Sequence, residues 1–598
     1  MGRGKLLTRA GVLGWMLTLL VPLWAQGTQD TKGEFSTLLR RGFEFHQHAD
    51  YVNAAALLRR AWKLNPHNYF VNLLLGVEML RTGDPDEAVG FLKEASRQRS
   101  NEDVPYGYMG EAQAAMGHHA EAAEAYLHAM QLSPLSQEAI QGWVDYSLER
   151  FRELAGRLRS SDRGLAAAYR LQAISLPLAD VKRRELLEHA ATLDPKAPGI
   201  WGELAMAHFA SGNSAAAQSD LSRAGAESAL DLRYSEVAAL LSANAGEWVA
   251  AAQHLNQIAS QSPGALARVI SDWPAALQPN DGSLVNGPAA KFLECARDAQ
   301  ENCTLDELSH QSSIEVRRAS ESREILYREQ RWDRLSALPA PGTSDSVLWL
   351  QWGESFAQLG KWPQAIPALE RGLRNQSDNV YAEFLLSSCY ANEAGRAVAR
   401  LQRIGAGEAV AHMVRGDVML RMQNNSAAAI AEYKLALASQ SDDPRLLERM
   451  AEALVSDGQF DAAVDYAHAA LRIDPYRFSA TRTLAQVAMR QRKYVEALPY
   501  LEQLATHDPK DLTTQVDLAT ALEQMGNFVE ALKHLEPALQ QKFPDEKGSL
   551  HSLLGTALRR VGRSQDAATA FATARRLSDE YQMSTHREEA TQKTGSPP

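Results

Sequence analysis

Small residues recur along the chain at a spacing of 34 positions, and larger apolar residues lie between them. Gly42, Gly76 and Gly110 mark one such position near the N-terminus. Further sets share the same spacing near both ends of the chain: Ala54, Ala88 and Ala122; Ala61, Ala95 and Ala129; Ala451, Ala485 and Ala519; and Ala463, Ala497 and Ala531. Self-similarity at a fixed period of this length indicates stacked repeats, each of which packs on its neighbours.

Each repeat is predicted to form two antiparallel helices. Small residues at positions 8 and 20 of the repeat let the first helix approach the second, and position 27 is small where the next repeat docks. Larger residues fill the gaps, as Trp352 does at position 7 of its repeat and Tyr126 at position 24. Proline at position 32, as in Pro66 and Pro475, ends the second helix because it lacks an N–H donor and clashes with the preceding turn. The pattern predicts an all-α chain with essentially no sheet.

These small and large positions resemble those of the tetratricopeptide-repeat family. The resemblance covers about twelve or thirteen units within residues 33–579. It implies an α-solenoid, a right-handed superhelix of antiparallel helix pairs. We predict an N-terminal array over 33–263 and a C-terminal array over 344–579.

The repeat pattern is broken in a few places. Between the arrays, residues 264–343 contain several Pro and Gly turn signals and are predicted to be an irregular helical connector. After Trp143 the pattern runs into an extra or lengthened helix, and the unit after Val380 is too short for a full helix pair. Residues 580–598 are polar and are predicted to form a disordered tail.

The first 26 residues have the features of a signal peptide. A basic stretch from Arg3 to Arg9 precedes an apolar run, Gly11–Trp24, and Ala25 is a small residue suited to the position before a cleavage. The run is too short to span about 30 Å of hydrocarbon comfortably. An uncleaved anchor is the alternative. We expect an exported protein, periplasmic or extracellular and belonging to a bacterial envelope, with no membrane span after signal cleavage.

Composition narrows the class of partner. Hydrophobic residues make up 45% of the chain, charged residues make up 23%, and the formal net charge is -11. An acidic chain of this kind argues against nucleic acid as the partner, since nucleic-acid binders usually carry a basic face. The expected partner is a protein or peptide.

The cysteines allow one disulfide within the predicted connector. Cys295 and Cys303 are eight positions apart, and the residues from Thr304 to Glu307 resemble a capping box that starts a new helix. A turn between the two cysteines would make a disulfide feasible, whereas one continuous helix would hold them about 12 Å apart. Two buried free thiols are the alternative.

No catalytic, cofactor-binding or metal-binding motif stands out. The chain has no His-Glu-x-x-His, Gly-x-Ser-x-Gly, phosphate-binding glycine loop or Cys-x-x-Cys. His46 and His48 would point about 200° apart on a helix, so they cannot chelate one ion. We therefore expect a scaffold without cofactor rather than an enzyme. The alternative is an enzyme, for example a carbohydrate-processing one, with an unrecognised site in 264–343.

The resemblance places a partner-binding groove along the first helix of each repeat. In the first two repeats the groove positions are mostly apolar, which suits an apolar peptide or helix unless the N-terminal segment folds back over them. In the last repeats they are polar and suit an acidic or extended peptide, the alternative being a solvated helix face. The candidate partner-binding residues are Leu39, Phe43, Phe70, Leu73, Val77, Arg482, Gln486, Arg490 and Arg559. The scaffold is expected to serve envelope-complex or polysaccharide assembly.

Overall fold

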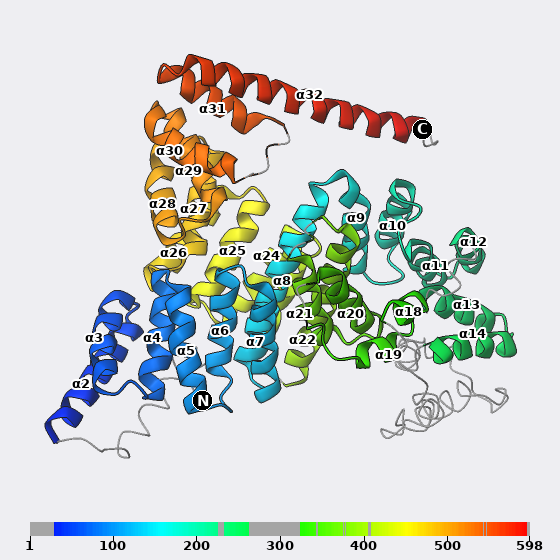
Figure 1. Cartoon of the computed structure of the whole chain (residues 1–598), viewed down its shortest axis with the longest axis horizontal. Helices are drawn as coiled ribbons and strands as arrows, with labels where there is room; N and C mark the ends of the chain where they lie inside the picture. The colour runs from blue at the N-terminus through cyan, green and yellow to red at the C-terminus, as the bar shows by residue number, and fades with distance from the viewer. Residues whose placement is uncertain are drawn as a thin grey trace. The chain divides into compact units, whose positions relative to one another are not determined.

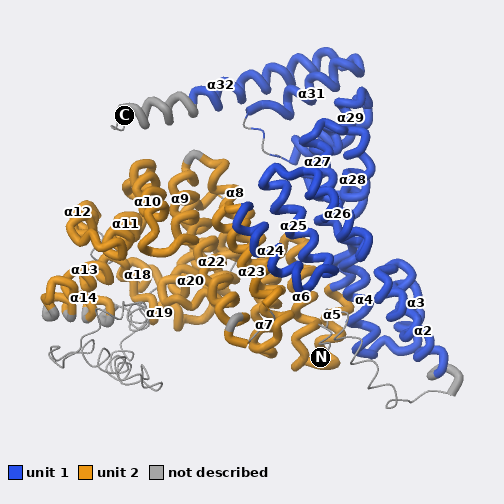
Figure 2. The backbone as a smooth tube through the Cα atoms, turned by 180° about the vertical axis from the view of Figure 1, so that it is seen from behind, with its two compact units in different colours: residues 1–88, 426–598 blue, residues 89–425 orange. Residues whose placement is uncertain are grey.

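The computed structural model describes residues 29–224, 232–261, 323–342, 345–374, 376, 378–404, 408–541, 543, 545 and 547–594. The described part is helical and contains no strand (Figure 1). It forms two compact units, coloured separately in Figure 2: unit 1 comprises Met1–Ala88 with Ser426–Pro598, and unit 2 comprises Val89–Asn425. Both units are built from successive antiparallel helix pairs, so the fold is an all-α solenoid as predicted.

Unit 1 brings together helices from both ends of the chain. They are α2 (Gln29–Gln47), α3 (Tyr51–Leu64), α4 (Tyr69–Thr82), α24 (Ser426–Ser439), α25 (Pro444–Ser456), α26 (Phe460–Ile473), α27 (Phe478–Arg490), α28 (Tyr494–His507), α29 (Leu512–Gln524), α30 (Phe528–Gln540), α31 (Ser549–Arg560) and α32 (Ser564–Thr594). α5 (Pro85–Gln98) runs from unit 1 into unit 2.

Unit 2 holds the middle of the chain. Its helices are α6 (Val104–Ala115), α7 (His119–Leu132), α8 (Gln137–Arg159), η1 (Asp162–Gly164), α9 (Leu165–Ile174), α10 (Val181–Leu193), α11 (Ile200–Ala210), α12 (Ser214–Ala224), α13 (Leu232–Asn244), α14 (Trp248–Gln261), α18 (Arg323–Arg328), α19 (Trp332–Ala337), α20 (Ser346–Gln358), α21 (Trp362–Leu373), α22 (Val380–Arg403) and α23 (Glu408–Arg421).

The 34-residue period is visible directly in where the helices begin. α25, α27 and α29 begin at Pro444, Phe478 and Leu512, and their partners α26, α28 and α30 begin 16 residues later in each case. The turn inside each of these pairs contains a left-handed residue at the same position. Gly458 and Gly526 supply it with φ of 80° and 84°, whereas Arg492 adopts 58°. Glycine suits this position because it has no Cβ to clash in the left-handed region.

Position 8 of the repeat is small for the reason that the pattern predicts. A Cβ added at Gly110 would lie 2.6 Å from the ring of Tyr126, which is 16 residues further on. The equivalent pair in a later repeat is Gly353 with Leu369, at 2.8 Å. In both repeats the second helix therefore lies too close to the first for any larger residue at position 8.

The two irregular repeats are partners in space. The lengthened helix after Trp143 is α8, and the short unit after Val380 is one long helix, α22, instead of a truncated helix pair. These two helices pack along one another in unit 2, and α7 packs on α21 beside them (Figure 1). Trp143 and Tyr390 are both fully buried in this contact. The two breaks in the repeat pattern therefore correspond to two long helices, α8 and α22, that pack on each other.

Each unit combines helices from both predicted arrays, because α8 packs on α22 in unit 2 and α3 lies against the end of α26 in unit 1. Of the predicted connector, the described residues 323–342 form the short helices α18 and α19. The signal peptide, Cys295 and Cys303 lie outside the described residues.

Residues 580–594, part of the tail over 580–598 that was predicted to be disordered, are helical. α32 continues as far as Thr594. The segment has no Pro or Gly between Ser564 and Thr594, so nothing in it breaks a helix. An i,i+4 ion pair of 2.8 Å between Arg576 and Glu580 supports the helix where the tail was expected to begin.

Candidate functional site

The apolar groove predicted in the first repeats is filled in the structure. Phe70, Leu73 and Val77 on α4 are 9%, 1% and 2% exposed, so they are packing residues here rather than an open surface. Leu39 and Phe43 on α2 are half-buried. The reason is that α4 is apolar from Tyr69 to Leu80 except at Asn72 and Glu78, and a mostly apolar helix of this kind is buried all round. The prediction of an open groove is therefore wrong for Phe70, Leu73 and Val77, whereas it is not contradicted at the half-buried Leu39 and Phe43.

Buried polar groups lie next to these residues. His46 Nδ1 lies 2.8 Å from Glu78 Oε1, and both side chains are buried. Burial raises the pKa of Glu78, while the hydrogen bond with His46 acts in the opposite direction. The ring of Tyr51 packs against Tyr476 at 5.0 Å, and its hydroxyl donates to Asp474 Oδ2 at 3.3 Å. These contacts join the first repeats of unit 1 to its C-terminal repeats.

The polar candidates in the last repeats lie on an exposed helix face. Arg482, Gln486 and Arg490 are four positions apart on α27, so they project from one side of it. The opposite side carries small and apolar residues that are buried, including Ala480 and Leu484. Gln486 and Arg490 are exposed, and Arg482 is partly exposed. We call these three residues the α27 face.

The charges on the α27 face are positioned by neighbouring repeats. Arg482 Nη1 donates to Asp511 Oδ2 at 2.8 Å, and Arg490 Nη1 donates to the carbonyl of Val455 at 3.3 Å. Although burial raises the pKa of Asp511, hydrogen bonds from Thr514 and the charge of Arg482 outweigh it and lower that pKa. The fourth predicted residue, Arg559, is exposed on α31 with its guanidinium 5.5 Å from the ring of Phe571. It is on a different helix from the other three.

A pocket in unit 2 was not predicted from the sequence. Its volume is about 280 Å³, and its lining residues come from α18, α20, α21, α22 and the loop before α22: Tyr327, Val347, Leu350, Gln351, Glu354, Leu369, Gln376, Asn379, Tyr381, Ala382 and Leu385. α20 supplies four of these residues at spacings of three and four, which places them on one face of that helix. We call this cavity the Glu354 pocket.

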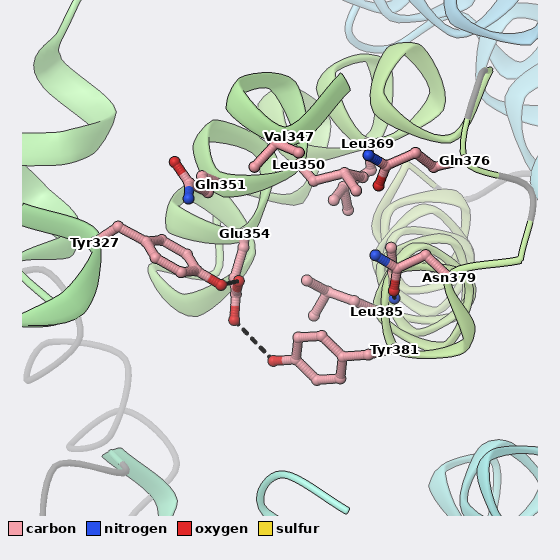
Figure 3. Close-up of a pocket in the computed structure, with 11 residues that line it drawn as sticks. Tyr327, Val347, Leu350, Gln351, Glu354, Leu369, Gln376, Asn379, Tyr381 and Leu385 are labelled. Atoms are coloured by element: carbon pink, nitrogen blue, oxygen red, sulfur yellow. Dashed lines mark hydrogen bonds between the residues drawn. The ribbon is translucent and has the colours of Figure 1, made fainter. Parts of the chain in front are cut away.

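Among the described lining residues, Glu354 is the one with an acidic side chain, and neutral donors hold it. Tyr327 Oη donates to Glu354 Oε2 at 2.6 Å, and Tyr381 Oη donates to Glu354 Oε1 at 2.8 Å. Figure 3 shows the two tyrosines reaching the carboxyl from different sides of the pocket. Burial raises the pKa of Glu354, and the hydrogen bonds from Tyr327, Tyr381 and Gln358 oppose that rise.

The sequence held only a partial signal for this pocket. The face of α20 formed by Val347, Leu350, Gln351 and Glu354 can be recognised from its spacing, but it resembles an ordinary packing face. Tyr327 comes from the predicted connector, where the repeat pattern gives no register. The sequence therefore could not show that α18 lies close enough to α20 for Tyr327 to reach Glu354.

The described residues contain no group of three or more His, Cys, Asp or Glu side chains that could hold a metal ion. Within the same part of the chain, no helix is both long enough and apolar enough to cross a bilayer.

Comparison with known families agrees with the repeat geometry. Two family models, both described as tetratricopeptide repeat, match the chain: one at residues 45–114 and 488–555, the other at 350–399, 420–478 and 448–511. The matched stretches of the chain are tetratricopeptide repeats. Repeats of this family are typical of non-catalytic scaffolds that bind protein or peptide partners.

A curated tetratricopeptide-repeat relative matches a short part of the chain. Tetratricopeptide repeat protein 21B of Xenopus laevis is 31% identical over 124 residues, which is 21% of this chain and 9% of that protein. The match thus spans about a tenth of the length of this relative.

Solved structures of this repeat type are also similar over parts of the chain. MamA 41-end from Desulfovibrio magneticus RS-1 is 22% identical, with 29% of this chain and 97% of that chain covered and a TM-score of 0.27. YrrB, described as a TPR protein with an unusual peptide-binding site, is 18% identical, with 32% and 95% covered and a TM-score of 0.27.

Proposed function

We propose that this tetratricopeptide-repeat protein is an exported scaffold that binds an extended or acidic segment of a protein partner on the α27 face. The observation that carries the proposal is the exposed row of Arg482, Gln486 and Arg490. The opposite side of their helix is buried against other helices, while on the row itself Gln486 is exposed and the guanidinium groups of Arg482 and Arg490 contact neighbouring repeats. A row of two arginines and an amide offers donors to carboxylates and to backbone carbonyls.

The geometry of the row suits an extended chain. Residues four apart on a helix are about 6 Å apart along its axis, so the row extends for about 12 Å. An extended peptide of about four residues covers the same length at about 3.3 Å per residue. Arg482 is already oriented by Asp511, which reduces the entropy lost when it binds.

Site-specific crosslinking tests this proposal in the producing cells. A photo-crosslinking amino acid at Gln486 is expected to capture a defined partner, whereas the same group at Glu502, an exposed residue on α28, is not. Reversing the charges with Arg482→Glu and Arg490→Glu is expected to abolish the Gln486 product. Equal capture from both positions, or capture that survives charge reversal, contradicts binding at the α27 face.

Export is tested separately. The mature N-terminus of protein recovered from cell fractions is expected to begin just after Ala25, and the protein is expected in the periplasmic or extracellular fraction. An intact Met1 terminus together with a cytoplasmic location would contradict export. A role in envelope-complex or polysaccharide assembly is part of the same proposal and is tested by the identity of the crosslinked partner.

A further inference from the structure

One buried glutamate of unit 2 differs from the others because it has no arginine partner in the described part of the chain. Among the described residues, four of the five pair with an arginine: Glu236 with Arg233, Glu370 with Arg150, Glu383 with Arg157 and Glu393 with Arg396. The fifth, Glu354, is 8% exposed and has no Lys, Arg or His of the described chain within ion-pair distance. It also lines a cavity, the Glu354 pocket.

A buried carboxyl without a cation is costly when it is ionised. In the other four sites an arginine from the protein offsets this cost. At Glu354 the two phenols and Gln358 supply hydrogen bonds but no charge. A carboxylate can accept about four hydrogen bonds, and this one accepts from Tyr327, Tyr381 and Gln358, so it keeps capacity for a further donor. When it is ionised, the carboxyl in this pocket therefore has no cation of the described residues to offset its charge.

The rest of the lining suits a cation carried on an aliphatic chain. Leu350, Leu369 and Leu385 offer apolar surface, against which the methylene groups of an arginine or lysine pack well. The side-chain carbonyl of Gln351 is a further acceptor for N–H groups, whereas that of Asn379 already accepts the backbone N–H of Ala382 at 3.0 Å. At about 30 Å³ for each water, the volume holds roughly nine waters, which is enough room for one long side chain.

We propose that the Glu354 pocket binds a guanidinium or ammonium group on an aliphatic stem, as presented by an arginine or lysine side chain of a peptide. Glu354 pairs with the cation, Tyr327 and Tyr381 hold the carboxylate in position, and the leucines contact the stem. This site is on unit 2 and is independent of the α27 face on unit 1. It would recognise a basic residue, whereas the α27 face is suited to an acidic or extended segment.

Calorimetric titration of the mature chain tests the pocket with defined probes. The probes are acetyl-Ala-Ala-Arg-Ala-Ala-amide, its lysine equivalent, and its citrulline equivalent, which keeps the shape of arginine without the charge. The arginine or lysine peptide is expected to bind with a Kd of about 1 mM or lower, and citrulline at least about 10-fold more weakly. Equal binding of arginine and citrulline, or no binding of either cationic peptide, overturns the proposal.

Variants assign the binding to Glu354. Glu354→Gln is expected to weaken binding of the cationic peptide at least about 10-fold. Glu393→Gln, which changes another buried glutamate of unit 2 away from the pocket, is expected to leave binding within about two-fold. Equal affinity for wild type and Glu354→Gln overturns the proposal. The citrulline comparison needs no variant, so the test remains decisive if Glu354→Gln fails to fold.

A last arm separates two sources of the cation. Agmatine carries the arginine guanidinium without a peptide backbone. Tighter binding of the arginine peptide than of agmatine assigns the pocket to a peptide, and equal or tighter binding of agmatine assigns it to a free amine. Either result supports a cation site provided that the citrulline peptide binds more weakly than the arginine peptide. Loss of the α27 crosslink would leave these titrations unchanged.

Discussion

Arg150 on α8 and Glu370 on α21 are 220 positions apart in the chain and form an ion pair through two hydrogen bonds of 2.9 Å. Both residues are 5% exposed. Tyr390 also donates to Glu370 Oε1, at 2.8 Å, so the carboxylate is bound by a second helix, α22. The pair joins the long helix α8 to α21, and Tyr390 adds the long helix α22 to the same cluster. The two buried charges are costly unless they remain together.

Removing one partner of this pair is expected to be far worse than removing both charges. Arg150→Met leaves Glu370 buried without its cation and should cost about 3–5 kcal/mol. Adding Glu370→Gln keeps an acceptor for Tyr390 and removes the buried charge, so the double variant should recover part of that loss. Thermal midpoints of the wild type, the two single variants and the double variant measure this. A double variant no more stable than Arg150→Met would contradict a charge-based role.

The close contact inside each repeat gives a second prediction. Gly110→Ala places a Cβ against the ring of Tyr126 and should destabilise the protein by about 1–3 kcal/mol, as overpacking does. Gly107→Ala is the matched control, because it is on the same helix and its Cβ meets nothing within 4 Å. That change should stabilise α6 by about 0.5–1 kcal/mol. In denaturation experiments, the free energy of unfolding should therefore fall for Gly110→Ala and rise for Gly107→Ala.

The sequence predicted the part of the fold that is local and periodic. The Gly110–Tyr126 contact lies within one repeat, so the offsets at positions 8 and 24 were enough to foresee it. The contact between Arg150 and Glu370 depends on which distant repeats meet, and a 34-residue period carries no information about that. The same limit applies to the Glu354 pocket, where Tyr327 comes from outside the regular repeats. The polar residues of the α27 face lie on the exposed side of their helix, and binding there stays a prediction.

The filled groove on α4 leads to a third prediction. Phe70→Ala should lower the stability by about 3–5 kcal/mol, because it truncates a buried aromatic side chain. Phe43→Ala should cost less, since that ring is only half-buried. Thermal denaturation of each single variant checks the order. A nearly unchanged midpoint for Phe70→Ala would instead support the open apolar groove that the sequence suggested.

The pKa of Glu354 makes a pH-dependent prediction. Burial raises this pKa in the folded protein, so the folded state holds the proton to higher pH than the unfolded chain does. The stability that Glu354 contributes is complete below the unfolded pKa of about 4.5 and is lost as the pH rises through the folded pKa. Glu354→Gln cannot ionise, so its midpoint relative to wild type should increase between about pH 4 and pH 8.

Glu153 is the control, because its pKa is shifted in the opposite direction to that of Glu354. Burial raises the pKa of its carboxyl, but the charge and hydrogen bond of Arg150 outweigh burial and hold the pKa below its usual value. Glu153 therefore contributes stability above the unfolded pKa, and this is lost as the pH falls through the folded pKa. The thermal midpoint of Glu153→Gln relative to wild type should therefore decrease as the pH rises. If the midpoint differences from wild type of Glu354→Gln and Glu153→Gln changed with pH in the same direction, the opposing environments of the two carboxyls would be contradicted.

Thiol titration tests the disulfide predicted from the sequence. Cys389 on α22 is 1% exposed, and burial raises the pKa of its thiol, so it should not react with a thiol reagent in the folded protein. The chain has three cysteines. If Cys295 and Cys303 are bonded, the folded protein should show no reactive thiol and the denatured, unreduced protein should show one. Three reactive thiols after denaturation without reductant would exclude the bond. In a Cys389→Ala variant the expected value after denaturation is zero, which assigns the single thiol to Cys389.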